Sequence, residues 1–112
     1  KIKKYEENIN DLYFCKLVLL DNNTLIGFIS IFPHDGEEIN LTPWYATMYV
    51  KKEYRGKGYS KILNDAILKE AKKRNIKTLY LKTELINYYE KFGAKYIKNI
   101  GKNEQLFKIN VI

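Results

Sequence analysis

Residues 45–60 constrain the fold of this chain more than any other segment. The apolar, β-branched and aromatic run at 45–50 is typical of a β-strand, and a basic turn that contains Gly56 and Gly58 follows it. Apolar residues at helical spacing begin directly after that turn. This order places backbone N–H groups and the positive end of a helix dipole at one point. The sequence therefore predicts a site for an anion such as a phosphate group.

Two other phosphate-binding glycine loops do not match this segment. A Walker loop requires a Gly-Lys pair followed by Ser or Thr, whereas Gly58 is followed by Tyr59. A dinucleotide-binding fingerprint requires a third glycine at the position of Lys61 and an acidic residue about 20 residues further on. Neither loop explains the pattern.

The turn does match another signature. Arg55, Gly58 and Ser60 fit the Arg-x-x-Gly-x-Gly/Ala acetyl-CoA signature of the GNAT-type (GCN5-related) N-acetyltransferase superfamily, and residues 43–58 resemble one branch of it closely. Ser60 departs from the usual Gly or Ala, but it is small and suits the start of a helix.

A second segment extends the resemblance. Residues 88–94 are similar to the Tyr-Glu-Lys-x-Gly-Phe segment that follows the fifth strand of these enzymes, with Ala94 in place of the aromatic residue. Tyr89 falls on the position that in many members hydrogen-bonds the coenzyme sulfur. The alternative is that Tyr89 only packs, since the chain has ten tyrosines. Tyr88 is interpreted as a packing residue.

The resemblance implies acetyl-CoA as co-substrate. The amides of residues 55–60 would hold the pyrophosphate, with added charge from Arg55 and Lys57, and the backbone of residues 48–50 would pair with the pantetheine arm as an added strand does. An N–H at the end of that strand would polarise the thioester carbonyl. The predicted coenzyme-binding residues are Met48, Tyr49, Val50, Arg55, Gly56, Lys57, Gly58, Tyr59 and Ser60.

The implied activity is an N-acetyltransferase that moves the acetyl group directly to a primary amine in a ternary complex. Tyr89 would act as the general acid that protonates the departing thiolate. The amine must arrive neutral, and Glu37, Glu38, Glu84 or a chain of waters would accept its proton. The acceptor is a small-molecule or peptide amine.

Residues 33–42 are the least regular part of the chain. They gather His34, Asp35, Glu37 and Glu38, so we interpret Glu37 and Glu38 as substrate-binding carboxylates for a cationic amine, with an exposed acidic loop as the alternative. His34 is the only histidine, which excludes a metal site built from a histidine cluster. Cys15 is expected to be a buried thiol without a catalytic role.

The hydrophobic pattern predicts one domain over residues 1–112 with an α/β (α+β) fold. Both strands of the first hairpin are apolar nearly throughout, which predicts a sheet covered on both faces. The expected elements are a helix at 1–10, strands at 14–20, 25–32 and 45–50, a helix at 59–74, a strand at 78–82, a helix at 85–92, and strands at 94–100 and 105–111.

These elements fit the GNAT-like acyl-CoA N-acyltransferase fold, a mostly antiparallel mixed sheet flanked by helices on both faces. Members of the superfamily generally carry a first strand and two helices at the N-terminus. We expect those helices to be shortened or missing here. A homodimer formed through a sheet edge is possible for such a fold.

The sequence leaves two alternative functions open, one of which is suggested by the net charge. Lys and Arg number 20 against 13 Asp and Glu, and this net charge of +7 favours polyanionic ligands in general. A basic nucleic-acid-binding module is the less favoured alternative, because the basic residues are scattered and no nucleic-acid signature is found. The other alternative is a catalytically degenerate acyl-CoA-binding or regulatory domain.

The cellular location of the protein is predicted from features that the sequence lacks. A single cysteine excludes an internal disulfide, and no apolar run approaches the roughly 20 residues that span a bilayer. The start shows no signal-peptide pattern. We therefore expect a soluble, cytoplasmic protein that makes no membrane contact.

Overall fold

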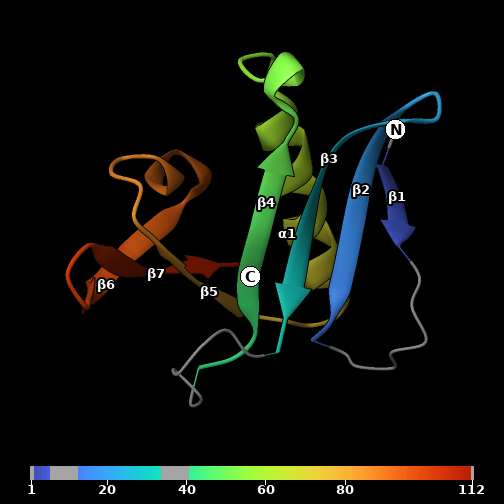
Figure 1. The fold of residues 1–112 in the computed structure, drawn as a ribbon. Helices are drawn as coiled ribbons and strands as arrows, with labels where there is room; N and C mark the ends of the chain where they lie inside the picture. Colours follow the sequence, from blue (N-terminus) through green and yellow to red (C-terminus); the bar gives the residue numbers. More distant parts are fainter. Residues whose placement is uncertain (1, 6–12, 34–40, 112) are drawn as a thin grey trace.

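The computed structural model describes residues 2–5, 13–33 and 41–111. In this part of the chain a seven-stranded sheet has the order β1-β2-β3-β4-β5-β7-β6 (Figure 1), and all neighbours are antiparallel except β4 and β5. The predicted mostly antiparallel mixed sheet is confirmed. The elements are β1 (Ile2–Tyr5), β2 (Cys15–Asp21), β3 (Thr24–Phe32), β4 (Trp44–Val50), η1 (Lys52–Tyr54), α1 (Tyr59–Lys73), β5 (Thr78–Thr83), η2 (Tyr89–Phe92), β6 (Ala94–Ile100) and β7 (Glu104–Asn110).

The predicted N-terminal helix is wrong where the structure describes it. Residues 2–5 form β1, which pairs with β2 from Ile2 opposite Leu19 to Tyr5 opposite Lys16. Ile2 and Tyr5 fit a helical spacing, but so short a segment gains more from hydrogen bonds to the open edge of β2 than from an isolated helical turn. Residues 6–10 of the predicted helix lie outside the described residues.

The predicted helix at 85–92 is largely wrong as well. Only η2, a 3-10 helix, forms there. Asn87 has a φ of +56°, a left-handed conformation that interrupts a right-handed helix, and Gly93 ends the segment with a φ of +89°.

Helix α1 covers one face of the sheet. Leu63, Ile67 and Ala71 recur every four residues, and all three are fully buried in the main core. The helix begins after Gly58 and ends where Asn75 adopts a φ of +60°, within a residue or so of the predicted limits. The η2 segment lies on this same face.

The other face carries a smaller core. Trp44, Ala46 and Leu106 are buried there, and the indole Nε1 of Trp44 donates a hydrogen bond of 2.8 Å to the carbonyl oxygen of Leu41. Within the described residues no helix covers this face, so the prediction of helices on both faces is confirmed there for one face only. In β2 only alternate residues are buried, which shows that its two faces differ.

Strand β4 is irregular in two ways. Phe28 of β3 pairs with Tyr49, while Ser30 pairs with Ala46, so Ile29 stands opposite two residues of β4. This is a β-bulge, which bends its strand and increases the local twist. On its other side β4 pairs with β5 at one position only, Trp44 opposite Tyr80. Figure 1 shows β4 and β5 diverging beyond that pair.

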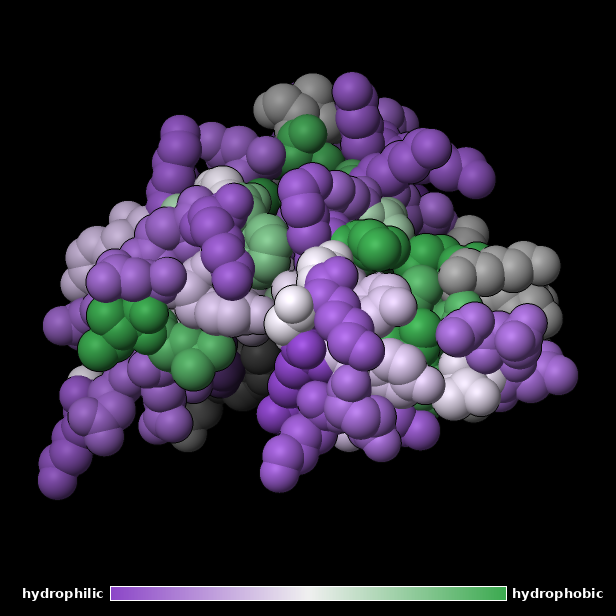
Figure 2. Space-filling view, turned by 90° about the horizontal axis from the view of Figure 1, so that it is seen from above, coloured by the Kyte–Doolittle hydropathy of each residue, from purple (hydrophilic) through white to green (hydrophobic). Residues whose placement is uncertain are grey.

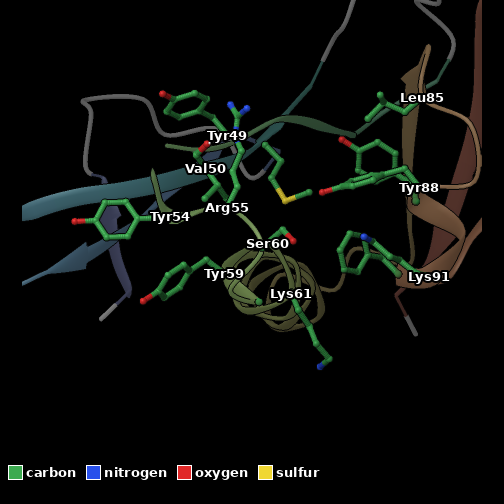
Figure 3. Close-up of a pocket in the computed structure, with 15 residues that line it drawn as sticks. Tyr49, Val50, Tyr54, Arg55, Tyr59, Ser60, Lys61, Leu85, Tyr88 and Lys91 are labelled. Carbon is green, nitrogen blue, oxygen red and sulfur yellow. Dashed lines mark hydrogen bonds between the residues drawn. The ribbon is translucent and has the colours of Figure 1, made fainter. Parts of the chain in front are cut away.

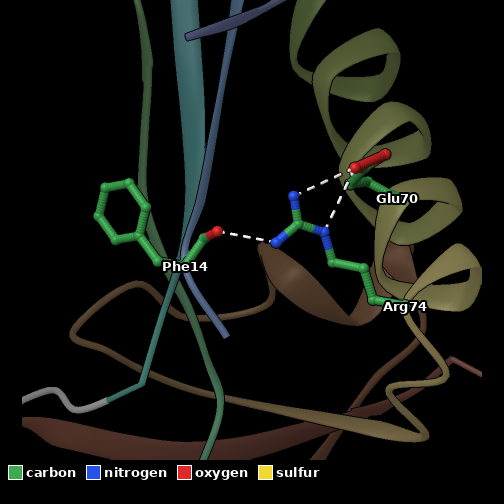
Figure 4. A network of polar contacts seen from close by, with 3 residues as sticks. All are labelled: Phe14, Glu70 and Arg74. Carbon is green, nitrogen blue, oxygen red and sulfur yellow. Dashed lines mark hydrogen bonds and ion pairs between the residues drawn. The ribbon is translucent and has the colours of Figure 1, made fainter. Parts of the chain in front are cut away.

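Arg74 connects the end of α1 to the start of β2 through polar contacts (Figure 4). Its Nη1 atom donates a hydrogen bond of 2.8 Å to the carbonyl oxygen of Phe14, and the same guanidinium lies 3.3 Å from a carboxylate oxygen of Glu70. Only 19% of the Arg74 side chain and 12% of the Glu70 side chain are exposed. Such a shielded ion pair contributes more than a solvated one.

We predict that Arg74→Leu lowers the free energy of unfolding by about 1–3 kcal/mol, because it removes charge-assisted hydrogen bonds in a shielded place. Urea unfolding measures this loss. The matched control is Lys61→Met, which breaks the exposed i,i+4 pair of Lys61 with Asp65 and is expected to cost no more than about 0.5 kcal/mol. Equal losses in the two variants would contradict the prediction.

Candidate functional site

A cavity of about 740 Å³ opens between the end of β4, the start of α1 and the η2 segment (Figure 3). Eight of the nine predicted coenzyme-binding residues line it, and so does Tyr89, although residues 60 and 89 are far apart in the sequence. Lys57 is the exception: its ammonium group lies 5.9 Å from the ring centroid of Tyr54, outside the lining. The fold thus brings both sequence motifs to one place.

The glycine turn presents backbone to this cavity. Gly56 and Gly58 have φ values of +77° and +84°, and a Cβ placed on either would have no heavy atom within 4 Å beyond the glycine itself and its two chain neighbours. Gly58 also caps α1, whose first N–H groups have no partners inside the helix. The first turn of α1, all of it described, carries no acidic side chain. These N–H groups and the helix dipole suit an anion.

Arg55 connects the turn to the end of β4. Its Nε donates a hydrogen bond of 2.9 Å to the carbonyl oxygen of Val50, and both residues line the cavity. The bond holds the exposed guanidinium beside the glycine turn, where its charge adds to that of the helix N-terminus.

The bulged half of β4 forms one wall. Tyr49 and Val50 pair with β3 on one side, and in the described chain residues 48–50 have no strand partner on the side facing β5. Met48, Tyr49 and Val50 line the cavity there. An extended ligand can hydrogen-bond to an open strand edge of this kind.

Tyr89 enters the cavity from the η2 side and is partly buried. Its ring meets the ring of Tyr88 edge to face, with centroids 4.8 Å apart. Burial raises the pKa of the Tyr89 phenol above its usual value, and the neighbouring Tyr88 raises it further. Since a phenol normally titrates near pH 10, Tyr89 is a protonated, neutral donor at pH 7.

Behind Tyr89 lies a buried pair of residues that was not predicted from the sequence. The Tyr45 hydroxyl donates a hydrogen bond of 2.9 Å to Oδ1 of Asn64, and both residues are buried. Burial is the main cause that raises the pKa of the Tyr45 phenol, with smaller contributions from Tyr89, Tyr88 and Asp65. The sequence feature that could have indicated this pair is Asn64, a polar residue next to Leu63 in the apolar stripe of α1.

Several further lining residues were not assigned to the site. Tyr88 and Lys91 lie across the cavity from Tyr54 and Tyr59 (Figure 3), and the Lys91 ammonium is 4.1 Å from the ring centroid of Tyr88. Tyr88 therefore packs, as expected, and also lines the cavity. The remaining unassigned lining residues are Lys61, Leu85 and Phe92.

The surface at this end of the molecule is mainly hydrophilic, with separate hydrophobic patches (Figure 2). Leu85 and Ile86, just before η2, are 50% and 78% exposed, and Leu85 lines the cavity. No carboxylate belongs to the described lining residues. Glu84 is exposed and lies outside the lining.

The proposed substrate carboxylates cannot be placed. Glu37 and Glu38, together with His34 and Asp35, lie outside the described residues. Cys15 is buried, as expected. The described residues contain no group of His, Cys, Asp and Glu side chains placed to hold a metal ion, and none of their helices has the length and apolarity to cross a membrane.

A family model for the acetyltransferase (GNAT) family matches residues 2–94. The chain belongs to this family. The GNAT resemblance of the two sequence motifs is thereby confirmed, and the family assignment covers most of the chain, including the glycine turn and η2. A sequence search of curated proteins gave no match.

Solved structures show the same fold. A GNAT family acetyltransferase from Elizabethkingia anophelis with acetyl-CoA bound has a TM-score of 0.74 at 16% identity, covering 98% of this chain and 97% of the other. Aminoglycoside 6'-acetyltransferase type Ii has a TM-score of 0.70 at 22% identity, covering 89% and 70%. PaiA N-acetyltransferase from Thermoplasma acidophilum in complex with coenzyme A has a TM-score of 0.71 at 25% identity, covering 85% and 59%. The GNAT fold expected from the sequence is confirmed.

A glycine of β3 sets how closely β3 and β4 approach beside the cavity. A Cβ on Gly27 would overlap the carbonyl oxygen of Tyr49 and lie 3.1 Å from Cα of Val50. We predict that Gly27→Ala lowers the free energy of unfolding by about 1–3 kcal/mol, because backbone atoms of β4 must shift. Urea unfolding measures the change.

The control for this prediction is Gly101→Asn. Gly101 has a φ of +62° in open space, and Asn tolerates that conformation, so its effect is expected to be about 0.5 kcal/mol or less. A Gly27→Ala protein as stable as this control would show that β4 accommodates the methyl group.

Proposed function

We propose that this protein is an N-acetyltransferase that transfers the acetyl group of acetyl-CoA to a primary amine by direct attack in a ternary complex. The observation that carries the proposal is the cavity where β4 parts from β5. It joins a glycine turn at a helix N-terminus, an open strand edge and a protonated tyrosine.

The residues present suit coenzyme A. The amides of residues 56–60 and the first turn of α1 would bind the pyrophosphate, and Arg55 adds positive charge beside them. The open edge at residues 48–50 would bind the amide groups of the pantetheine arm in the manner of an added strand. Lys57, outside the lining, would act at most through its charge at longer range.

The end of β4 would also stabilise charge on the reacting carbonyl. A backbone N–H at the bulge would donate to the thioester oxygen, which becomes more negative as the amine nitrogen attacks the carbonyl carbon. A bulge favours this role, because it turns a backbone group away from the regular ladder.

Tyr89 would supply the proton that completes the transfer. The new C–N bond forms, the C–S bond breaks with its electron pair on sulfur, and the phenol of Tyr89 gives its proton to that thiolate. With the usual pKa values of about 10 for a phenol and about 8.5 for a thiol, the proton transfer is uphill by roughly 2 kcal/mol, and the raised pKa of Tyr89 adds to that cost. The proton lost by the amine would leave through water, or to Glu37, Glu38 or Glu84.

The acceptor is proposed as a small-molecule or peptide amine. Two of the solved structures similar to this chain are aminoglycoside 6'-acetyltransferases, which supports a small-molecule amine. The alternative with the same fold, an acyl-CoA-binding domain without turnover, requires coenzyme binding but no catalytic role for Tyr89.

We expect acetyl-CoA to bind in a one-to-one complex that isothermal titration calorimetry detects, with ATP and a short oligonucleotide binding far more weakly. Gly58→Ala should weaken acetyl-CoA binding about 10- to 100-fold, because it disturbs one or two charge-assisted hydrogen bonds at the turn. Gly101→Ala is the matched control, since Gly101 also has positive φ and open surroundings but lies in the β6–β7 hairpin, outside the cavity lining.

Equal affinity for acetyl-CoA and the two other polyanions would contradict the coenzyme site. Strong, salt-dependent binding of the oligonucleotide alone would favour the basic nucleic-acid module instead.

We expect Tyr89→Phe to lower kcat about 100- to 10,000-fold while the Kd for acetyl-CoA stays nearly unchanged, because the phenol acts on the leaving sulfur. The raised pKa of Tyr89 also sets the pH dependence. A general acid works while protonated, so loss of the Tyr89 proton should lower the rate only as pH rises above about 10. Steady-state kinetics between pH 7 and pH 11 measure both effects.

Tyr96→Phe is the control, since Tyr96 is an exposed tyrosine of β6 outside the cavity. Unchanged kcat in Tyr89→Phe would remove Tyr89 from the mechanism. Binding of acetyl-CoA without turnover of any amine would support the alternative, an acyl-CoA-binding domain without catalytic activity.

A further inference from the structure

We propose that Tyr45 is a positioning residue for Tyr89: its buried hydrogen bond to Asn64 fixes the Tyr45 ring, and that ring holds the Tyr89 ring facing the cavity. The inference rests on the proposed catalytic role of Tyr89. It concerns Tyr45 and Asn64, to which the sequence assigned no role in the site.

The hydrogen bond between Tyr45 and Asn64 is short and buried. The Tyr45 hydroxyl lies 2.9 Å from Oδ1 of Asn64, and the two residues are only 4% and 3% exposed. A hydrogen bond in such surroundings has few competing partners and a well-defined geometry. The sulfur of Met48, a lining residue, is 3.8 Å from the same hydroxyl. The bond therefore fixes Tyr45 between α1 and the bulged part of β4.

The ring of Tyr45 is in direct contact with the ring of Tyr89. Tyr45 and Tyr89 meet edge to face, with centroids 5.9 Å apart and an interplanar angle of 80°. In the described chain Tyr89 has two other aromatic contacts, Tyr88 and Phe92, and both come from the same short segment. Tyr45 is thus the aromatic partner that connects Tyr89 to the sheet and, through Asn64, to α1.

The segment that carries Tyr89 is too short to fix the orientation of the Tyr89 ring by itself. The η2 segment is a single 3-10 turn with no fully buried residue, and it follows Asn87 in a left-handed conformation. Such a segment does not fix a side chain as a long packed helix does. The Tyr45 contact supplies the missing restraint from a strand and a helix of the main core.

Tyr45 itself takes no part in proton transfer. Burial raises the pKa of its phenol, and Tyr89, Tyr88 and Asp65 raise it further, so the hydroxyl stays a donor to Asn64 throughout the working pH range. The ionisable groups around Tyr89 are Tyr45 from β4, Tyr88 from its own segment and Lys91 at the cavity wall, with Asp65 on α1 acting on Tyr45.

The test compares three variants: Tyr45→Phe, Asn64→Leu and the double variant. Each single change leaves one polar partner buried, so both should lower the melting temperature by several degrees. The double variant replaces the pair by apolar side chains and should recover most of that loss. If the hydrogen bond positions Tyr89, kcat in the double variant stays about 10- to 100-fold below that of the unmodified protein, while the Kd for acetyl-CoA is unchanged.

A second measurement does not require activity. Titration of the tyrosines by NMR, with the Tyr89 signal assigned by Tyr89→Phe, reports the pKa of Tyr89. We expect that pKa to fall toward 10 in Tyr45→Phe and in the double variant, because a less restrained ring is more hydrated. Tyr80→Phe is the matched control: Tyr80 is also partly buried and in contact with an aromatic ring, that of Trp44, but it lies on the other face of the sheet.

The proposal is overturned if the double variant recovers kcat together with its stability, or if the Tyr89 pKa does not change in either variant. Failure of the proposed function is a separate result: the unmodified protein would then bind no acetyl-CoA or acetylate no amine. The NMR titration still decides the positioning role in that case.

Discussion

The single position at which β4 pairs with β5 is the constraint on which the site depends. Beyond Trp44 and Tyr80 the two strands diverge, and the bulge opposite Ile29 bends β4 further. A continuous ladder would fill this space with backbone hydrogen bonds. The divergence leaves instead an open edge of β4 and room for a cavity between the end of β4, the start of α1 and η2, while α1 and the smaller core around Trp44 keep the two halves of the sheet together.

The other parts of the site are arranged around that opening. The glycine turn brings the N-terminus of α1 to the end of β4, and Arg55 fixes the turn to the carbonyl of Val50. From the other side η2 supplies Tyr89, and Tyr45 connects it to α1 through Asn64. The groups proposed to bind the anion, to polarise the carbonyl and to donate the proton thus come from three elements that meet only in the folded chain.

Local patterns predicted much of this fold from the sequence. The strands at 14–20, 25–32 and 94–100 and the helix at 59–74 were expected within one or two residues of their observed limits, because their apolar periodicity and turn residues agree with their tertiary environment. The failures have physical causes. Residues 2–5 became a strand because an open edge of β2 was available, and Asn87 interrupted a helix that periodicity alone favoured.

The sequence by itself determined the family, the glycine turn and the position of Tyr89, since each depends on residues that are close together in the chain. It also predicted eight residues that line the cavity beside the glycine turn. Only the tertiary structure decided that Lys57 lies outside the cavity and that Tyr88 and Lys91 belong to its wall. The same holds for the Tyr45–Asn64 pair, because a hydrogen bond between residues 19 positions apart depends on how α1 packs against β4, which no local pattern contains.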